Sequence, residues 1–340
     1  MPITQPEDPI LITGAGGFIG SRVVRVLLDR GYTRLRCFVR PSSNLKRLHE
    51  AIEDKTANAE IFTGNLLSPD DCRRAAEGIS DAFHLAAGLE KSFAGAFMNS
   101  VLTTRNLIEA LQVQESFQRF VNISSFAVYS NLNMRRGELL DETCPVEDSP
   151  QKRYDPYGFA KLKQDELVQR YGIERGLRFV ILRPGAVYGP GKKDLSGRVG
   201  IDTFGMFLHL GGSNRLPLTH VDNCAEAIVQ AGLTEGVEGE VFNVVDDELP
   251  TSREFLRSYK REVKRFFSLP LPYTVTYALC ALWEKYSEWS QGQLPPVFNR
   301  RRCAAEWKGN EYSNVKLKHL TGWKPKIQFS QDGVLSQEPA

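Results

Sequence analysis

Short runs of branched and apolar residues recur through the first 245 residues, separated by segments in which apolar residues repeat with the period of a helix. Such runs are typical of buried strands, and the segments between them are typical of amphipathic helices. This alternation predicts an α/β fold with a doubly wound, parallel sheet. The seven runs are PILIT from Pro9, LRCFV from Leu35, AEIF from Ala59, DAFHL from Asp81, RFVNIS from Arg119, LRFVIL from Leu177 and EVFNVV from Glu240.

A glycine-rich turn lies between the first apolar run and the first helical segment. The stretch ITGAGGFIG, residues 12–20, places Gly14, Gly17 and Gly20 in the spacing GxxGxxG. Side chains there would block the tight turn, keep a pyrophosphate away from the backbone and push the helix off the sheet. Backbone N–H groups at a helix start can bind phosphate. Glycine-rich turns also occur as plain surface loops, but the flanking strand and helix predict a dinucleotide-binding site.

Two segments interrupt the alternation of strands and helices. One is residues 185–218, which is rich in glycine and carries Lys192 and Lys193, and the other begins after about residue 247. We expect the two segments to pack together as a smaller substrate-binding lobe beside a dinucleotide-binding Rossmann domain. The expected division is 1–184 plus 219–247 for the Rossmann domain, 185–218 plus 248–328 for the lobe and 329–340 for a tail.

One segment, FFSLPLPYTVTYALCALW at residues 266–283, contains no charged residue. Its eighteen residues are close to the minimum length of a membrane span. Because Pro270 and Pro272 interrupt it, an uninterrupted helix is expected only from Tyr273 to Tyr286. We expect this helix to lie in the substrate lobe or at an oligomer interface. Contact with a membrane surface and a true span remain as alternatives.

Composition argues against several classes of protein. The 43 basic and 41 acidic residues nearly cancel, so no overall charge favours nucleic acid, and a small-molecule substrate is expected. The six cysteines form no CxxC pair and the five histidines form no HExxH motif, which predicts reduced thiols and no metal site. The N-terminal stretch MPITQPEDPI does not have the pattern of a secretory signal, so a cytoplasmic enzyme is expected.

The sequence YGFAK, residues 157–161, places a phenol and an ammonium group four residues apart. On a helix, Tyr157 and Lys161 would project from one face. A cation about 4 Å away would lower the pKa of the phenol from about 10 toward neutrality, where general acid–base catalysis is most efficient. This spacing is also common on exposed helices. The upstream stretch NISSFAVYS favours catalysis, because its strand ends at Ser124 and Ser125 and ligands bind beyond the carboxyl ends of such strands.

These motifs resemble, in their order along the chain, those of the extended short-chain dehydrogenase/reductases. That family includes the NAD-dependent epimerase/dehydratases of nucleotide sugars. The resemblance runs from about Ile10 to about Lys326. It rests on TGAGGFIG, HLAA at residues 84–87, Asn99 in FMNSVLTTRNLIEA, SSFAVYS, YGFAK, RPGAVYGPG and THVDNCAEAI.

The resemblance implies a role for each matching residue. Tyr157 would be the catalytic acid/base, Lys161 would lower its pKa and hold the nicotinamide ribose, and Ser125 would hydrogen-bond the substrate oxygen. Ser124 and Tyr129 are further candidates for substrate contacts. Family members are often dimers through the helices near Asn99 and Tyr157, so a homodimer is one arrangement that the resemblance allows. Besides Tyr157 and Lys161, the implied cofactor-binding residues are Gly14, Gly17, Phe18, Ile19, Gly20, Leu66, Leu85, Ala86 and Pro184.

Three positions depart from the family pattern. The second strand ends in FVRPSSN, so Arg40 stands where an acidic residue would bind the adenosine ribose hydroxyls. A guanidinium there favours the 2′-phosphate of NADP over NAD, although Arg40 could instead stack on adenine or point to solvent. Asn65 replaces an aspartate near adenine and can still make such a hydrogen bond. The stretch SNLN follows Tyr129 where sugar-nucleotide enzymes commonly have a glycine, so the wall of the substrate pocket is expected to differ.

The resemblance implies an NAD(P)-dependent oxidoreductase or epimerase that transfers hydride at a secondary alcohol or ketone. A nucleotide-activated sugar is the expected substrate, with Arg215 and Arg198 as candidates to bind its diphosphate. Phe126 follows Ser125 where a 4,6-dehydratase commonly has an acidic residue, which disfavours dehydration.

Two alternatives remain open. The stretch SNRLPLTHVDNCAEAI and the apolar segment 266–283 also fit an enzyme similar to 3β-hydroxysteroid dehydrogenase that acts on an apolar carbonyl. A regulatory protein could bind NAD(P) without turnover. Such relatives usually lose the tyrosine or the lysine, and this chain retains Tyr157, Lys161 and Ser125.

Overall fold

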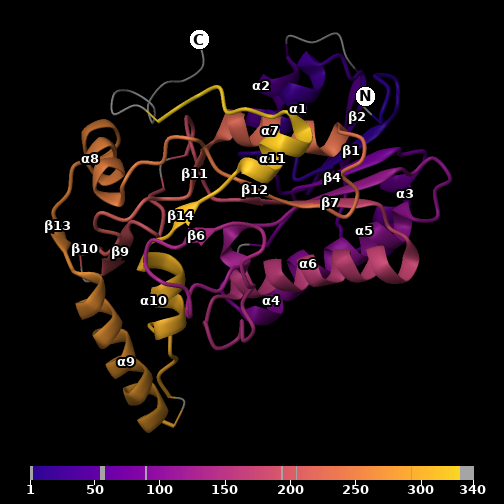
Figure 1. Cartoon of the computed structure of the whole chain (residues 1–340). Coiled ribbons are helices and arrows are strands. Elements are labelled where there is room, and N and C mark those ends of the chain that lie inside the picture. The colour runs from indigo at the N-terminus through magenta and orange to yellow at the C-terminus, as the bar shows by residue number, and fades with distance from the viewer. Residues whose placement is uncertain are drawn as a thin grey trace.

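A seven-stranded sheet forms the centre of the molecule, with helices on both faces (Figure 1). The computed structural model describes residues 3–53, 58–88, 90–192, 194–203, 205–291 and 293–329, so Lys193 and most of the expected tail lie outside the described residues. The strand order is β12-β7-β5-β4-β1-β2-β3, and neighbouring strands run parallel. The strands are β1 (Ile10–Thr13), β2 (Arg34–Val39), β3 (Asn58–Thr63), β4 (Asp81–His84), β5 (Arg119–Ile123), β7 (Phe179–Pro184) and β12 (Val241–Val244). The predicted doubly wound sheet is confirmed.

The two faces of the sheet carry separate apolar cores. On one face Val24 and Leu27 of α1 pack with Ile228 of α7, and on the other Leu107 of α5 packs with Val168 of α6. Figure 1 shows the first set of helices above the sheet and the second below it. The first set is α1 (Gly20–Asp29), α2 (Lys46–Ile52), α7 (Val221–Leu233) and α11 (Val315–Thr321). The second is α3 (Pro69–Ala76), α4 (Phe93–Phe97), α5 (Thr103–Leu111) and α6 (Pro156–Arg175).

A π-helical turn, Met98–Leu102, joins α4 to α5 and contains Asn99. Wider turns of this kind are rare and frequently occur at functional sites. The apolar pattern predicts one continuous helix here, because a single inserted residue does not disturb the helical period enough to be visible in the sequence.

A second group of elements lies beside the carboxyl edge of the sheet. Its core contains Phe126, Leu162, Leu218 and Phe255, and so joins the loop after β5 to the later part of the chain. The short strands are β6 (Leu139–Leu140), β8 (Ala186–Tyr188), β9 (Gly200–Thr203), β10 (Met206–His209), β11 (Leu218–His220), β13 (Ser268–Pro270) and β14 (Glu311–Tyr312). The helices are α8 (Ser252–Glu262), α9 (Tyr273–Trp289) and α10 (Arg300–Trp307).

The last helix belongs with the central sheet. Leu317 of α11 and Trp323 after it are buried in the same core as α1 and α7. The predicted division assigns residues 248–328 to the substrate lobe, and these contacts favour a boundary between β14 and α11 instead. The division into two domains stays a prediction.

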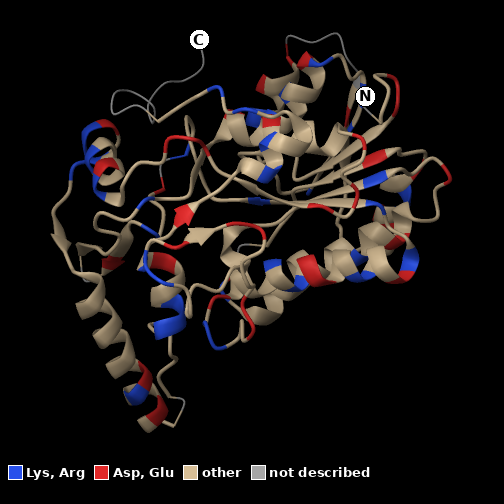
Figure 2. Ribbon diagram, in the orientation of Figure 1, with Lys and Arg blue, Asp and Glu red and all other residues tan. Residues whose placement is uncertain are grey.

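The uncharged segment forms β13 and the first part of α9. The helix begins at Tyr273, directly after Pro272, as the two prolines predict. Among the described residues, no helix is both long and apolar enough to cross a membrane. Figure 2 shows that α9 projects from the body of the molecule and that its charged residues gather at its far end.

Candidate active site

The glycine-rich turn brings β1 and α1 into very close contact. A Cβ atom at Gly20 would lie 2.1 Å from the carbonyl oxygen of Gly14, a distance at which no side chain fits. Gly14 has a φ of +70°, in the left-handed region that glycine adopts without strain. The N–H of Gly17 donates to the Gly14 carbonyl over 2.9 Å and closes the turn. The backbone at the start of α1 is therefore left open to a ligand, as phosphate binding requires.

A cavity of about 870 Å³ lies at the carboxyl edge of the sheet. It brings together the glycine-rich turn, the ends of β5 and β7 and the start of α6. The sequence-predicted residues that line it are Gly14, Gly17, Phe18, Ile19, Gly20, Leu85, Ser124, Ser125, Tyr157, Lys161, Pro184 and Arg198.

A second hollow of about 380 Å³ continues from the first across the glycine-rich turn. The two share Gly14, Gly17 and Leu85 in their linings. The second also contains Arg40, Asn65, Leu66, Ala86 and Asn99. The elongated site that results has the glycines at its middle and Tyr157 in its first part, an arrangement that suits a dinucleotide.

Tyr157 does not have the lowered pKa that the sequence predicts. Burial raises the pKa of Tyr157 above its ordinary value, and a hydrogen bond with Ser125 partly opposes this effect. Both Tyr157, the predicted acid/base, and Ser125, the predicted substrate-binding hydroxyl, line the cavity. The expectation that Lys161 brings the phenol near neutrality is wrong for this structure.

Lys161 is almost fully buried, and its ammonium group donates to the protein. It donates to the carbonyl oxygen of Ile123 over 2.5 Å and to Oε1 of Gln164 over 2.9 Å. Burial lowers the pKa of Lys161 to about 8, while the charge of Asp165 acts in the opposite direction. Lys161 therefore remains mostly protonated at neutral pH and is aimed at the end of β5.

A chain of buried polar side chains connects Lys161 to the first strand. Gln164 donates to Oγ1 of Thr104 over 2.7 Å, and Thr104 Oγ1 lies 2.9 Å from Nε2 of His84. The other ring nitrogen of His84 lies 2.8 Å from Oγ1 of Thr13. Burial and then the charge of Lys161 lower the pKa of His84 to about 3, so the ring is neutral. This chain fixes the orientation of Lys161 from behind the cavity.

Ser124 and Tyr129, both candidates for substrate contacts, take part in a second buried network, although Ser124 also lines the cavity. Ser124 donates to Oδ2 of Asp165 over 2.9 Å, and Arg183 donates to the same oxygen over 3.1 Å. Tyr129 is 1% exposed, donates to Oδ1 of Asn243 over 2.7 Å and lies under the guanidinium of Arg183. It is absent from the cavity lining. The prediction for Tyr129 is therefore wrong, because its ring packs in the core instead of facing the site.

The two arginines proposed to bind a diphosphate lie in different places. Arg198 lines the cavity that contains Tyr157, and its Nη1 donates to the carbonyl of Ala305 over 2.9 Å. Arg215 faces a separate hollow, donates to the carbonyl of Leu249 and pairs with Glu311 over 3.4 Å. Arg215 does not line the Tyr157 cavity, so its prediction is wrong. The sequence could not separate the two arginines, because their positions depend on long-range pairing.

Two cations at the cavity mouth were not predicted to contact this site. Arg47 of α2 donates to the carbonyl of Gly191 over 2.6 Å, and its guanidinium lies over the ring of Phe18. Lys192 also lies over Phe18 and donates to the carbonyl of Val187. The sequence marks Lys192 only as part of a basic pair. Both cations stand beside the glycine-rich turn, where they would add positive charge near a pyrophosphate.

Arg153 and Asp155 form a second feature of the cavity wall that sequence reasoning missed. Arg153 is buried, donates to the carbonyls of Ala127 and Tyr129 and pairs with Asp155 over 2.6 Å. Although burial alone would raise it, the charge of Arg153 lowers the pKa of Asp155. The pair anchors the turn that precedes α6, and so positions the helix that carries Tyr157.

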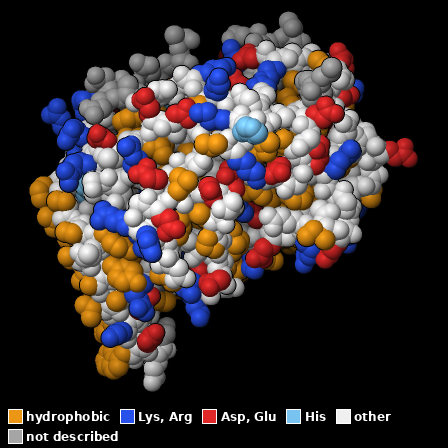
Figure 3. Space-filling view, viewed as in Figure 1, with side chains coloured by type: hydrophobic (Ala, Val, Ile, Leu, Met, Phe, Trp, Pro, Cys, Tyr) orange, Lys and Arg blue, Asp and Glu red, His pale blue; other side chains and the backbone are white. Residues whose placement is uncertain are grey.

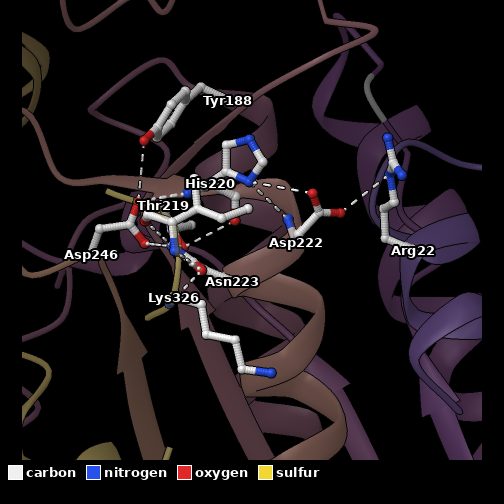
Figure 4. A network of polar contacts seen from close by, with 9 residues as sticks. Arg22, Tyr188, Thr219, His220, Asp222, Asn223, Asp246 and Lys326 are labelled. Atoms are coloured by element: carbon white, nitrogen blue, oxygen red, sulfur yellow. Dashed lines mark hydrogen bonds and ion pairs between the residues drawn. The ribbon is translucent and has the colours of Figure 1, made fainter. Parts of the chain in front are cut away.

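The motif THVDN forms a buried network next to the site (Figure 4). Asp246, at the end of β12, accepts hydrogen bonds from the side chains of Tyr188, Thr219 and Asn223 and from the N–H of His220. Burial raises the pKa of Asp246 to about 6, against the effect of these hydrogen bonds. The carbonyl oxygen of the Asn223 side chain accepts from the N–H groups of Lys326 and Ile327. The motif therefore joins strands β8, β11 and β12 to the C-terminal segment.

Comparison with known proteins identifies a family whose sequence model matches this chain, together with several relatives. The sequence model described as "NAD dependent epimerase/dehydratase family" matches residues 10–244. The chain is 30% identical to cinnamoyl-CoA reductase 1 of Petunia hybrida over 184 residues, 53% of this chain and 55% of the reductase. It is 26% identical to GDP-mannose 3,5-epimerase 1 of Oryza sativa subsp. japonica over 266 residues, 72% of this chain and 66% of the epimerase. The chain thus spans roughly half to two thirds of the length of these relatives.

The fold also matches solved structures. The UDP-glucuronic acid 4-epimerase of Bacillus cereus, solved with UDP-glucuronic acid and NAD, superposes with a TM-score of 0.70. The match covers 94% of this chain and 95% of that one at 21% sequence identity. This likeness establishes that the two chains share a fold.

Proposed function

Because the chain belongs to the NAD-dependent epimerase/dehydratase family, we propose that it is an NAD(P)-dependent epimerase or oxidoreductase of a nucleotide-activated sugar. The observation that carries the proposal is the single cavity in which Tyr157, Ser125 and Lys161 meet the glycine-rich turn. The proposed reaction is hydride transfer at a secondary alcohol or ketone. A bound nicotinamide supplies the hydride acceptor or donor.

In this proposal Tyr157 moves the proton that accompanies the hydride. Its raised pKa keeps the phenol protonated, which suits donation to a ketone oxygen. Ser125 lines the same cavity as Tyr157 and would hold the same substrate oxygen. In the opposite direction Tyr157 would have to act as the phenolate, a state whose stabilisation the family resemblance assigns to Lys161. Lys161 would also hold the hydroxyls of the nicotinamide ribose.

The cofactor is proposed to be NAD(P), with NADP slightly preferred. Arg40 is exposed and faces the second hollow, together with Asn65 and Leu66. In the described chain no ion pair holds its guanidinium, so it is available to a 2′-phosphate. The solved Bacillus cereus relative contains NAD, and only titration separates the two cofactors.

Charged groups in the cavity favour a polar substrate. Arg153, Arg198, Asp194 and Glu306 are among the residues that line it. Arg198 lines the cavity and would bind a diphosphate, and the related epimerases from rice and Bacillus cereus are named for nucleotide sugars. A reductase of an apolar carbonyl and a non-catalytic NAD(P)-binding protein are the alternatives. A cytoplasmic location and a homodimer also stay predictions.

The test begins with the small molecules released when the purified protein is denatured, identified by mass spectrometry. Calorimetric titration with NAD and NADP in both redox states follows. The protein is then incubated with a panel of UDP- and GDP-hexoses and, separately, with ketosteroids, and the products are analysed for inverted stereocentres and for net oxidation or reduction.

Tightly bound NAD and an inverted sugar would establish an epimerase that recycles its hydride. An empty site with a preference for NADPH and reduction of an apolar ketone would favour the steroid-dehydrogenase-like alternative. If cofactor binds but no substrate turns over, and Tyr157→Phe has no effect, the non-catalytic alternative stands. Absence of binding for all four dinucleotides would contradict the proposal.

A further inference from the structure

Helix α9 exposes a continuous apolar stripe. Val275, Leu279, Leu282, Tyr286 and Trp289 follow one another at intervals of four and three residues, so they lie on one face of the helix. Their exposed fractions range from 44% to 77%, unusually high for a row of large apolar side chains. Phe267 and Leu269, at and before β13, extend the apolar surface toward α8 and are also exposed.

The opposite face of α9 is already occupied. Thr276 and Cys280 are buried, and Cys280 packs with Cys303 and Trp307 of α10. Near the far end, Ser287 donates to the carbonyl of Leu294 and Trp283 to that of Pro295. These contacts fix the rotation of α9 about its axis. The apolar stripe therefore faces outward as a consequence of the packing on the other side.

A basic surface adjoins the apolar stripe. The exposed charged residues between Ser252 and Trp283 are all basic, namely Arg253, Arg257, Arg261, Lys264 and Arg265. Figure 3 shows basic side chains along the upper part of one edge of the molecule and apolar side chains along the lower part of the same edge, over α9. The acidic residues Glu284 and Glu288 lie at the far end of α9, and Glu284 is paired with Arg300.

We propose that α9 and the basic face of α8 dock the protein on the surface of an anionic lipid bilayer. An interfacial helix buries an apolar face at the boundary of headgroups and acyl chains, and adjacent basic residues strengthen binding to anionic lipid. Trp289 and Tyr286 suit the interface, because their rings combine an apolar body with a polar group. The helix lies on the bilayer without crossing it, in agreement with the absence of a spanning helix from the described residues.

A second copy of the chain fits the stripe less well. The 4–3 spacing would also suit a coiled coil, but the stripe of α9 spans only about two heptads, and coiled coils are expected to sustain three or four. The basic surface of α8 would meet the same positive charge on an identical copy of itself. An anionic bilayer, in contrast, complements both the basic surface of α8 and the apolar stripe of α9.

The experiment is co-sedimentation of the full chain with vesicles of phosphatidylcholine alone and of phosphatidylcholine with phosphatidylglycerol. We expect binding to the anionic vesicles that weakens at high salt. The double variant Leu279→Glu and Leu282→Glu should lose more than about tenfold in partitioning, since it removes two leucine side chains that the bound protein would bury in the bilayer. The double variant Arg257→Gln and Lys264→Gln should lose about fivefold per residue.

Matched controls carry the same changes elsewhere on the surface. Val113→Glu with Val315→Glu replaces two exposed apolar residues, and Lys46→Gln with Arg73→Gln removes two exposed cations. Both should bind vesicles as the unchanged protein does. Thermal unfolding and NAD(P) titration are measured for each variant, so that loss of the fold can be separated from loss of the membrane-binding surface.

Three results would overturn the proposal. One is equal binding of the Leu279/Leu282 variant and the unchanged protein, and another is equal binding to neutral and anionic vesicles. The third is absence of binding to anionic vesicles. If sedimentation velocity then shows a dimer that the Leu279/Leu282 variant dissociates, the stripe is an interface between copies of this chain. None of these results depends on the proposed enzymatic activity.

Discussion

At the scale of single residues, the candidate site is built as much from buried supports as from the side chains that face the cavity. Lys161 is positioned through Gln164, Thr104 and His84, which reach back to Thr13 on the first strand. The spacing of Tyr157 and Lys161 and the family resemblance of the stretch around Ser125 predict these three residues, but the sequence gives no indication of their supports. Nor does it show that burial raises the pKa of Tyr157, since burial is a property of the folded chain.

Replacing His84 with Gln should change the acid stability of the protein. The pKa of His84 falls from its ordinary value of 6.5 to about 3 on folding, so the unfolded chain binds an extra proton between these values. The free energy of unfolding therefore decreases as pH falls below about 6.5. In His84→Gln this contribution is lost, and the slope against pH should be smaller by up to about 1.4 kcal/mol per pH unit.

Urea unfolding at several pH values between about 4 and 7 measures that slope. The matched control is His49→Gln, because His49 lies on the surface of α2 and is exposed in the folded chain. This control removes a histidine ring that is exposed, so it separates the effect of the buried ring from that of replacing any histidine. If the His84 variant and the unchanged protein have the same slope of unfolding free energy against pH, the buried ring does not titrate as the structure indicates.

Replacing Arg40 with Gln tests the cofactor preference. If the guanidinium binds a 2′-phosphate, Arg40→Gln should weaken NADPH binding by about ten- to a hundredfold, the usual cost of a charge-assisted hydrogen bond. NADH binding should change by less than about twofold, because NADH has no group for the arginine. Calorimetric titration of both cofactors provides the measurement, with Arg73→Gln as the surface control. If the affinities for NADPH and NADH fall by the same factor, Arg40 contacts the adenine ring that both cofactors share instead of a 2′-phosphate.

At the scale of elements, the seven strands and the turn after the first strand could be predicted, because a parallel sheet buried on both faces leaves a strong apolar pattern. The start of α9 was predictable for the same kind of local reason, since a proline fixes it. Features that depend on contacts across the molecule were not. Arg215 pairs with Glu311, Tyr129 bonds to Asn243, and α11 packs against the central sheet.

Replacing Gly20 with Ala should damage both the fold and the cofactor site. The added methyl group would lie 2.1 Å from the carbonyl oxygen of Gly14, so the turn or α1 must shift. We expect a loss of about 1–3 kcal/mol in the free energy of unfolding and a loss of dinucleotide binding. In the matched control Gly16→Ala, the nearest atom would be 3.3 Å away, and the effect should be smaller. Equal effects in denaturant unfolding would contradict the close approach of β1 and α1.

At the scale of the whole molecule, the network around Asp246 and Asn223 connects the central sheet to the segment that follows α11 (Figure 4). Its strand β11 pairs with β8, and Ala186 and Val187 of β8 line the cavity, so the network that holds the chain together also supports the wall of the site. The exposed stripe of α9 lies outside this network, on a helix that contacts the rest mainly through α10.

Replacing Asn223 with Ala should destabilise the protein through this network. The variant loses hydrogen bonds to Asp246, Lys326 and Ile327, and leaves buried groups without partners. We expect the free energy of unfolding to fall by about 1–3 kcal/mol in denaturant titration. The neighbouring control Asp222→Asn weakens the contacts of a partly exposed carboxylate with Arg22 and with the ring of His220, and should cost less than about 1 kcal/mol. A larger loss in the control would show that the network is not the main support.

The measurement that tests the central claim most directly follows the redox state of bound nicotinamide in the unchanged protein and in Tyr157→Phe. Each protein, loaded with NAD or NADP, is mixed with UDP- and GDP-hexoses, and the absorbance of reduced nicotinamide is recorded in stopped flow. The account predicts reduction with at least one sugar in the unchanged protein. In Tyr157→Phe the rate should fall by about a hundredfold or more, while dinucleotide binding stays within about twofold. Equal rates in the two proteins, or loss of dinucleotide binding in the variant, would contradict the proposed role of Tyr157.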